Sequence, residues 1–113
     1  MKTMQPFYVN ISVYEAAEII DDAIVRGSMT GECIAHYELR TKAEGTCVVG
    51  VYEKHYYRAG NRLTLTVTID SFETTTRIIT VSGGGGEGFM RFDWGAAESF
   101  ENTVARALAP YTL

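Results

Sequence analysis

The spacing of hydrophobic residues changes along this chain from a helical period to a strand period. Apolar residues between positions 13 and 24 recur at intervals of three and four, which predicts an amphipathic helix. A short β-like run at 7–11 precedes it. Ser12, followed three positions later by Glu15, is typical of a capping box and marks the start of the helix. Gly27 is expected to end it.

From residue 32 onward the hydrophobic period becomes two, which indicates β-strands. We expect strands at about 32–40, 47–58, 63–70 and 75–82, with turns at 42–45 and 59–61. The strand at 63–70 has the clearest pattern, because its aliphatic residues alternate with threonines that suit a solvated sheet face. Asp93 is expected to cap a final helix whose apolar stripe includes Phe100 and Val104.

The predicted order of elements is strand, helix, four strands, helix. Strands joined by short turns are antiparallel neighbours, and two helices with one apolar stripe each must cover the same sheet face. The sequence therefore predicts an α+β fold of β-α-β-β-β-β-α order, a curved antiparallel sheet with both helices on one face. This order resembles a helix-grip or TBP-like arrangement, a likeness of fold alone. We expect a single domain over 1–113, because 113 residues are too few for two cores.

Composition and charge limit the classes of function. A hydrophobic content of 46% with 21% charged residues is that of an ordinary globular domain. The net charge of −4 argues against nucleic-acid binding, and glutamates are interleaved with the basic residues between 40 and 62. No apolar run is long enough to span a membrane, and the N-terminus lacks the apolar core of a signal peptide. We expect a cytoplasmic protein with no nucleic-acid or membrane partner.

The cysteines and histidines do not form a recognisable metal or disulfide pattern. Cys33 and Cys47 lie on opposite sides of a predicted turn, but a disulfide is not favoured in a reducing compartment, so we expect free, buried thiols. His36 and His55 do not have the spacing of zinc ligands. Nucleotide-binding motifs and a nucleophile elbow are also missing from the sequence. We therefore expect neither a metal nor another cofactor.

A glycine tract separates the last predicted strand from the last helix. Its glycines are Gly83, Gly84, Gly85, Gly86 and Gly88, with Glu87 among them. Since glycine pays the largest backbone entropy on folding, we expect a solvent-facing crossover in which several of them take positive φ. A mobile flap and an anion-binding loop are the alternatives. The lack of a GKS or GKT ending and the negative charge of Glu87 favour the structural crossover.

The phase of the strand at 47–58 leaves two interpretations open. If Val49 and Val51 face the core and the alternation continues, then Glu53, His55 and Tyr57 face it too, and a carboxylate beside an imidazole there suits acid–base chemistry. If a β-bulge interrupts the strand, or if the end of the strand reaches solvent, the phase flips and the core takes tyrosines 52 and 56 instead. The second interpretation is favoured, because bulges arise in many ways.

Four segments carry a resemblance to a known family. They are 16–20 (AAEII), 52–58 (YEKHYYR), the glycine tract and 92–95 (FDWG). Together they resemble a small bacterial family of single-domain proteins of unknown function, over nearly the whole chain. The resemblance implies a compact domain and no particular activity, cofactor or catalytic residue.

These observations lead to two hypotheses of function. The first is a non-enzymatic module that binds a small apolar or amphipathic ligand between the sheet and the last helix, near Tyr57, Trp94 and Phe100. Glu53 and His55 are the polar candidates for the same site. The second is an interaction protein that forms a homodimer through a strand edge or an aromatic hairpin. An active site assembled from scattered residues stays open as an alternative.

Overall fold

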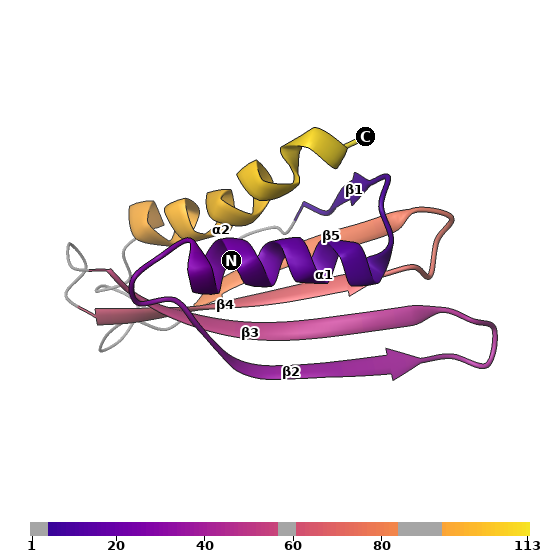
Figure 1. Ribbon diagram of the computed structural model, residues 1–113, viewed down its shortest axis with the longest axis horizontal. Coiled ribbons are helices and arrows are strands. Elements are labelled where there is room, and N and C mark those ends of the chain that lie inside the picture. Colours follow the sequence, from indigo (N-terminus) through magenta and orange to yellow (C-terminus); the bar gives the residue numbers. More distant parts are fainter. Residues whose placement is uncertain (1–4, 57–60, 84–93) are drawn as a thin grey trace.

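The computed structural model describes residues 5–56, 61–83 and 94–113 (Figure 1). Its elements, in chain order, are β1 (Phe7–Val9), α1 (Val13–Asp21), the π-helical turn η1 (Asp22–Arg26), β2 (Glu32–Arg40), β3 (Thr46–Tyr56), β4 (Asn61–Asp70), β5 (Thr76–Gly83), α2 (Trp94–Leu108) and the 3₁₀ turn η3 (Ala109–Tyr111). The predicted elements and their order are confirmed, with boundaries that differ by one or two residues.

The five strands form one antiparallel sheet in the order β1-β5-β4-β3-β2. Both long helices lie on the same face of this sheet, which we call the inner face, and the opposite face is the outer face (Figure 1). The α+β prediction is therefore correct. The strands β2 to β5 are joined in sequence, while β1 pairs with β5 and so occupies one edge, leaving β2 at the other.

The hydrophobic core lies between the inner face and the two helices. Its most deeply buried members come from β1, β4, β5, α1, η1 and α2: Val9, Leu63, Leu65, Val67, Ile78, Ala16, Ile20, Ile24, Phe100, Val104 and Leu108, all at most 1% exposed. Each large aliphatic or aromatic side chain buried in this way stabilises the fold by roughly 1.5–3 kcal/mol. On β4 the threonines take the outer face, as the alternation predicts.

The start of α1 has the local structure that its sequence predicts. Ser12 Oγ accepts a hydrogen bond from the Glu15 backbone N–H at 3.1 Å, and Glu15 Oε1 accepts one from the Ser12 backbone N–H at 3.4 Å. This reciprocal pair satisfies two amide groups that have no partner within the helix. Gly27 ends the helical segment with φ −80°, where a Cβ would lie 2.3 Å from the Ala23 carbonyl oxygen. Space therefore requires glycine at position 27.

The favoured interpretation of β3 is correct in its outcome and wrong in its cause: Tyr52 lies in the core and Tyr56 packs against it, but no bulge in β3 produces this phase. Pairing with β4 is continuous from Cys47 to Tyr56, so no bulge interrupts the strand. Val48 and Tyr52 belong to the core, and therefore Val49 and Val51 lie on the outer face. The alternation continues, and it carries Glu53 and His55 to the outer face rather than toward the core. The β-bulge lies instead in β2, between Cys33 and Ala35.

The beginning of the glycine tract is part of the sheet. Gly83 is the last residue of β5 and pairs with Thr64, and its φ is not in the left-handed region. The prediction that it belongs to a crossover loop is wrong for this residue, because the β4–β5 ladder extends one residue beyond Ser82. Gly84, Gly85, Gly86 and Gly88, like the expected cap Asp93, lie outside the described residues.

Candidate functional site

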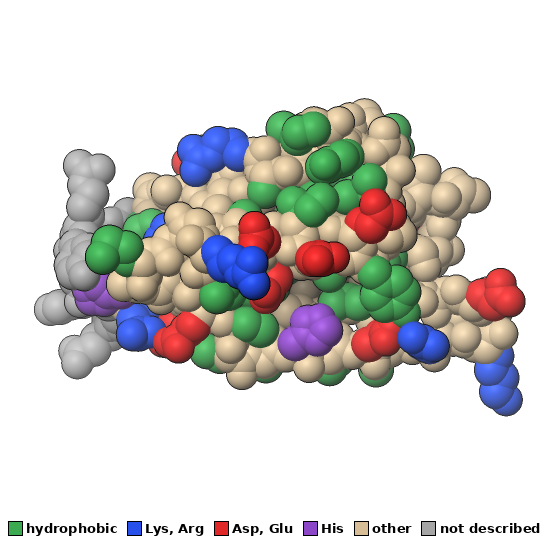
Figure 2. All heavy atoms as spheres, in the orientation of Figure 1, with side chains coloured by type: hydrophobic (Ala, Val, Ile, Leu, Met, Phe, Trp, Pro, Cys, Tyr) green, Lys and Arg blue, Asp and Glu red, His purple; other side chains and the backbone are tan. Residues whose placement is uncertain are grey.

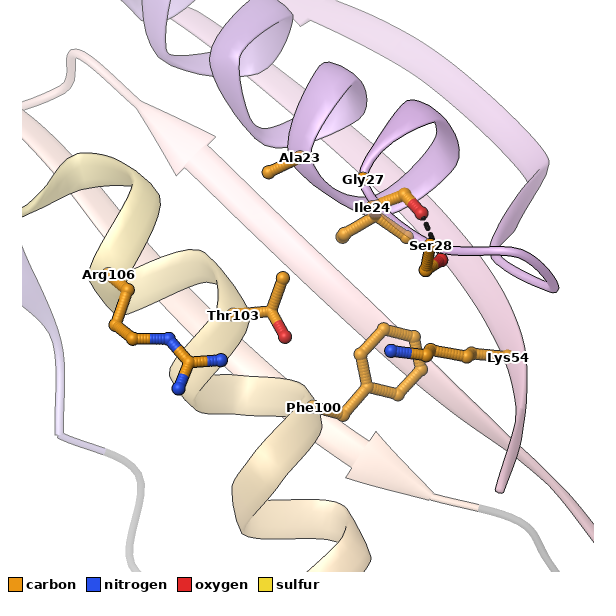
Figure 3. Close-up of a pocket in the computed structure, with 8 residues that line it drawn as sticks. All are labelled: Ala23, Ile24, Gly27, Ser28, Lys54, Phe100, Thr103 and Arg106. Carbon is orange, nitrogen blue, oxygen red and sulfur yellow. Dashed lines mark hydrogen bonds between the residues drawn. The ribbon is translucent and has the colours of Figure 1, made fainter. Parts of the chain in front are cut away.

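A pocket opens where η1, β3 and α2 meet (Figure 3). Its volume is about 140 Å³, and it is lined by Ala23, Ile24, Gly27, Ser28, Lys54, Phe100, Thr103 and Arg106. An apolar cavity of about 150 Å³ holds a molecule the size of benzene, so this pocket has room for one ring or a short chain. Drug-sized ligands require about 300 Å³ or more.

The pocket has an apolar base and a cationic rim. Phe100 and Ile24 are buried and close its base. Lys54 from β3 and Arg106 from α2 approach from opposite sides, and Figure 3 shows their side chains directed toward one another across Phe100 and Thr103. Ser28 and Thr103 add two hydroxyl groups to the lining. Because Phe100 and Ile24 are at most 1% exposed, most of the lining that a ligand touches is polar, and the arrangement suits a small anion with a short apolar end.

The two cations carry no ion pair with the described residues. The Lys54 ammonium lies 5.1 Å from the centre of the Tyr56 ring, which provides a cation–π contact but no compensating negative charge. The salt bridges of the described residues involve other arginines: Arg26, Arg40, Arg62 and Arg77. Two positive charges at one pocket therefore retain their capacity to bind an anion.

Tyr56 packs against Phe100 of the pocket lining. Its ring centre lies 5.7 Å from that of Phe100, and the two planes are inclined by 50°. Burial raises the pKa of its hydroxyl, while Ser99 and the positive charge of Arg106 act in the opposite direction. The hydroxyl oxygen is buried and makes no hydrogen bond with the described residues, although Ser99 is close. Tyr56 is not part of the pocket lining, so its role there is to hold Phe100 in place.

The local sequence explains how these side chains converge. Lys54 follows Tyr52 in the even-numbered phase of β3 and therefore points toward the helices. Phe100, Thr103 and Arg106 are spaced by three along α2, which places them on neighbouring parts of one helix surface. Sequence reasoning missed this site because the favoured interpretation placed Tyr52 and Tyr56 in the core without following the same phase to Lys54, which lies between them. The sequence signal for the site was Lys54, which alternates with Tyr52 and Tyr56 and so shares their face of β3.

Of the residues predicted for a ligand site, only Phe100 lies at this pocket. Glu53 is on the outer face, where Arg62 Nη1 donates to its Oε1 at 2.6 Å and to Glu32 Oε1 at 2.9 Å. The backbone N–H of His55 donates to Thr30 Oγ1 at 3.1 Å. Tyr57 and the side chain of Trp94 lie outside the described residues. The structure thus separates Glu53 and His55 from Phe100 by the thickness of the sheet.

A second hollow runs between α1 and β2 and has a different chemistry. It is lined by Ala17, Glu18, Asp21, Cys33 and His36, and acidic side chains gather over α1 in Figure 2. A thiol and an imidazole in one hollow suggest nucleophilic chemistry, but partial desolvation of the sulfur and the charge of Asp21 raise the pKa of Cys33. A raised pKa leaves less thiolate at neutral pH, so this thiol is not activated.

The described residues also bear on the remaining predictions from sequence. Cys33 and Cys47 are free thiols, but only Cys47 is buried; Cys33 is exposed because its strand is at the sheet edge. Within the described part of the chain, His, Cys, Asp and Glu side chains form no group of three suited to a metal ion. No helix among the described residues has both the length and the apolar character needed to cross a membrane.

Comparison with known proteins places the chain in a family. No curated protein matches the chain, and no solved structure does. The model of a family of unknown function, DUF6054, matches residues 2–112, which is nearly the whole sequence. This agrees with the resemblance to an uncharacterised single-domain family. The chain therefore belongs to the DUF6054 family of unknown function.

Proposed function

We propose that this protein is a binding module for a small amphipathic carboxylic acid, which it holds in the pocket between η1, β3 and α2. One observation carries the proposal: Lys54 and Arg106 converge on a pocket with an apolar base, and neither forms an ion pair with the described residues. The apolar part of the ligand would contact Phe100 and Ile24. Its carboxylate would lie between the ammonium and the guanidinium group, where charge-assisted hydrogen bonds are strongest.

The volume of the pocket narrows the class of ligand. At about 140 Å³ it fits a single aromatic ring or a chain of a few carbons, and not a fatty acid or a lipid. The hydroxyls of Ser28 and Thr103 already donate to the carbonyl oxygens of Ile24 at 2.6 Å and Ser99 at 3.2 Å, so the two cations are the donors for the carboxylate. The lining contains no carboxylate that could act as a base, and no activated nucleophile, so binding rather than catalysis is the proposed role.

Benzoate and benzamide provide a matched pair of probes. They have nearly the same shape, but only benzoate carries the negative charge. In NMR titrations we expect benzoate to shift the amide signals of residues around Phe100, and benzamide to bind at least about tenfold more weakly, since a charged pair contributes roughly 1.5–3 kcal/mol. Equal affinity for the two probes, or no shift at millimolar benzoate, would contradict the proposal.

Two variants test the roles of the cations. Lys54→Met and Arg106→Met keep most of the aliphatic volume and remove the charge, so each should weaken benzoate binding and leave benzamide binding unchanged. Arg26→Met is a matched control, because Arg26 is an exposed arginine on η1 outside the pocket lining. We also propose a cytoplasmic location, on the ground that an exposed free thiol such as Cys33 suits a reducing compartment.

A further inference from the structure

Strand β2 is at the edge of the sheet, and no other strand among the described residues pairs with its free side. All nine of its residues are exposed, including Ile34, Tyr37 and Leu39 at 49–56%. Such a strand presents a row of backbone N–H and C=O groups to solvent and is a template for pairing with another strand. In Figure 2 charged and apolar side chains are interspersed along the lower rim, where Figure 1 places β2.

The two faces of β2 differ in chemistry. Ala35, Tyr37 and Leu39 pair with outer-face residues of β3 and form an apolar row. His36 and Glu38 lie on the inner face, opposite Gly50 and Val48. The β-bulge between Cys33 and Ala35 limits the regular part of the edge to Ala35–Arg40. Pairing with a further strand must therefore centre near the middle of that segment.

We propose that a second copy of this chain pairs with β2 around a two-fold axis at Tyr37, joining two five-stranded sheets into one. An axis perpendicular to the sheet makes the strands antiparallel and keeps the helices of both copies on one face. Each residue of one copy is therefore paired with a residue of the other copy that lies on the same face of the sheet. In this register Tyr37 meets its own counterpart, Ala35 meets Leu39, and His36 meets Glu38.

Neighbouring registers that preserve the faces are less favourable. An axis at Glu38 would oppose two glutamates directly and set His36 against Arg40. An axis at His36 would oppose two histidines and bring the bulged segment at Cys33 into the pairing. The register centred on Tyr37 keeps the outer-face pairs apolar and gives the inner face two His–Glu pairs, one on each side of the axis. Charge and shape thus select one register.

Glu38 is already held in position for this contact. The Tyr14 hydroxyl donates to Glu38 Oε1, and Arg40 donates through Nε to the same oxygen at 3.2 Å. Arg40 Nη2 also donates to the Tyr14 hydroxyl at 3.0 Å. The carboxylate therefore loses little conformational freedom on association. The His36 side chain makes no hydrogen bond within the described part of the chain, and an imidazole N–H donates to a carboxylate whether the ring is neutral or charged.

Charge exchange at the His36–Glu38 pairs tests the proposal by sedimentation equilibrium. Wild-type protein should be dimeric, and His36→Glu should weaken the dimer by about tenfold or more, because two like-charge pairs replace two favourable ones. Adding Glu38→Lys to His36→Glu should restore the dimer. Asn102→Glu adds the same charge at an exposed position of α2 and should have no effect. A monomeric wild type, or a dimer that His36→Glu leaves unchanged, would overturn the proposal.

Cysteine cross-linking tests the register directly. In a Cys33→Ser background, Tyr37→Cys places two thiols at the axis, where opposed Cα atoms are about 4.5–5.5 Å apart and within disulfide range. Oxidised glutathione should convert this variant into a covalent dimer. Ala35→Cys in the same background should not cross-link, because the two copies of position 35 are about four residues, or roughly 13 Å, apart. Cross-linking at Ala35 instead of Tyr37 would exclude this register.

Discussion

Replacing Gly50 by alanine tests the packing between β3 and α1. Gly50 lies on the inner face of β3, two residues before Tyr52, and the Tyr52 ring lies across it. A Cβ at position 50 would be 2.8 Å from Tyr52 Cε2 and 3.3 Å from Cζ and the hydroxyl oxygen. That hydroxyl donates to Asp21 Oδ1 at 3.1 Å, and the residue is only 3% exposed, so the ring has no free space to enter.

The expected change in unfolding free energy combines two destabilising contributions and one stabilising contribution. Overpacking of a core costs about 1–3 kcal/mol, and displacement of the Tyr52–Asp21 hydrogen bond costs a further 0.5–1.5 kcal/mol or so. Alanine in place of glycine within a strand contributes roughly 0.5–1 kcal/mol in the favourable direction. The net loss of unfolding free energy should be about 2 kcal/mol, or a fall of roughly 10 °C in melting temperature.

Urea denaturation followed by circular dichroism measures this loss, and a double-mutant cycle assigns its cause. In a Tyr52→Leu background the clashing ring atoms are absent, so Gly50→Ala should be neutral or stabilising by about 0.5–1 kcal/mol. If Gly50→Ala stabilises the wild-type protein, or costs the same in both backgrounds, the steric reasoning is wrong.

Three further predictions concern the turn, the outer face and pH. Glu44 has φ 67° in the β2–β3 turn, so Glu44→Gly should raise the unfolding free energy by about 0.5–1 kcal/mol, whereas Ala43→Gly should lower it, both measured in urea. On the outer face, Asp70 is 2% exposed and accepts hydrogen bonds from Arg77 Nε at 2.9 Å and Nη2 at 3.1 Å. Asp70→Ala should therefore lower the unfolding free energy by about 2–4 kcal/mol. A loss below about 1 kcal/mol would contradict a structural role for this ion pair. Burial raises the pKa of the Tyr52 hydroxyl well above its ordinary value of about 10, so its contribution to stability is complete below pH 10 and is lost as the pH rises further. Above pH 10 this group should lower the unfolding free energy by about 1.4 kcal/mol per pH unit. In urea titrations between about pH 9.5 and 11, the unfolding free energy of Tyr52→Phe should therefore fall less steeply with pH than that of the wild type.

The amino-acid sequence by itself determined the elements and their order. Hydrophobic periods of 3.6 and 2 are local properties, because the residues of a helix or strand alone show that one of its sides is apolar. The capping box at Ser12 and the alternation of β4 depend on neighbours within a few residues, and both were predicted correctly. The antiparallel order of β2 to β5 followed from the short turns between them.

Only the tertiary structure decided which face of β3 is buried. Val49 and Val51 are as hydrophobic as core residues, so the local pattern of β3 fits either phase. Val48 and Tyr52 are buried by helix α1, which is more than 20 residues away in the sequence. Because these two residues face the helices, Glu53 lies on the outer face and Lys54 lies at the pocket. The exposure of β2 likewise depends on its place at the sheet edge, which is a property of strand order. Long-range contacts therefore selected the candidate site, because a strand's own sequence does not record which of its faces a distant helix will cover.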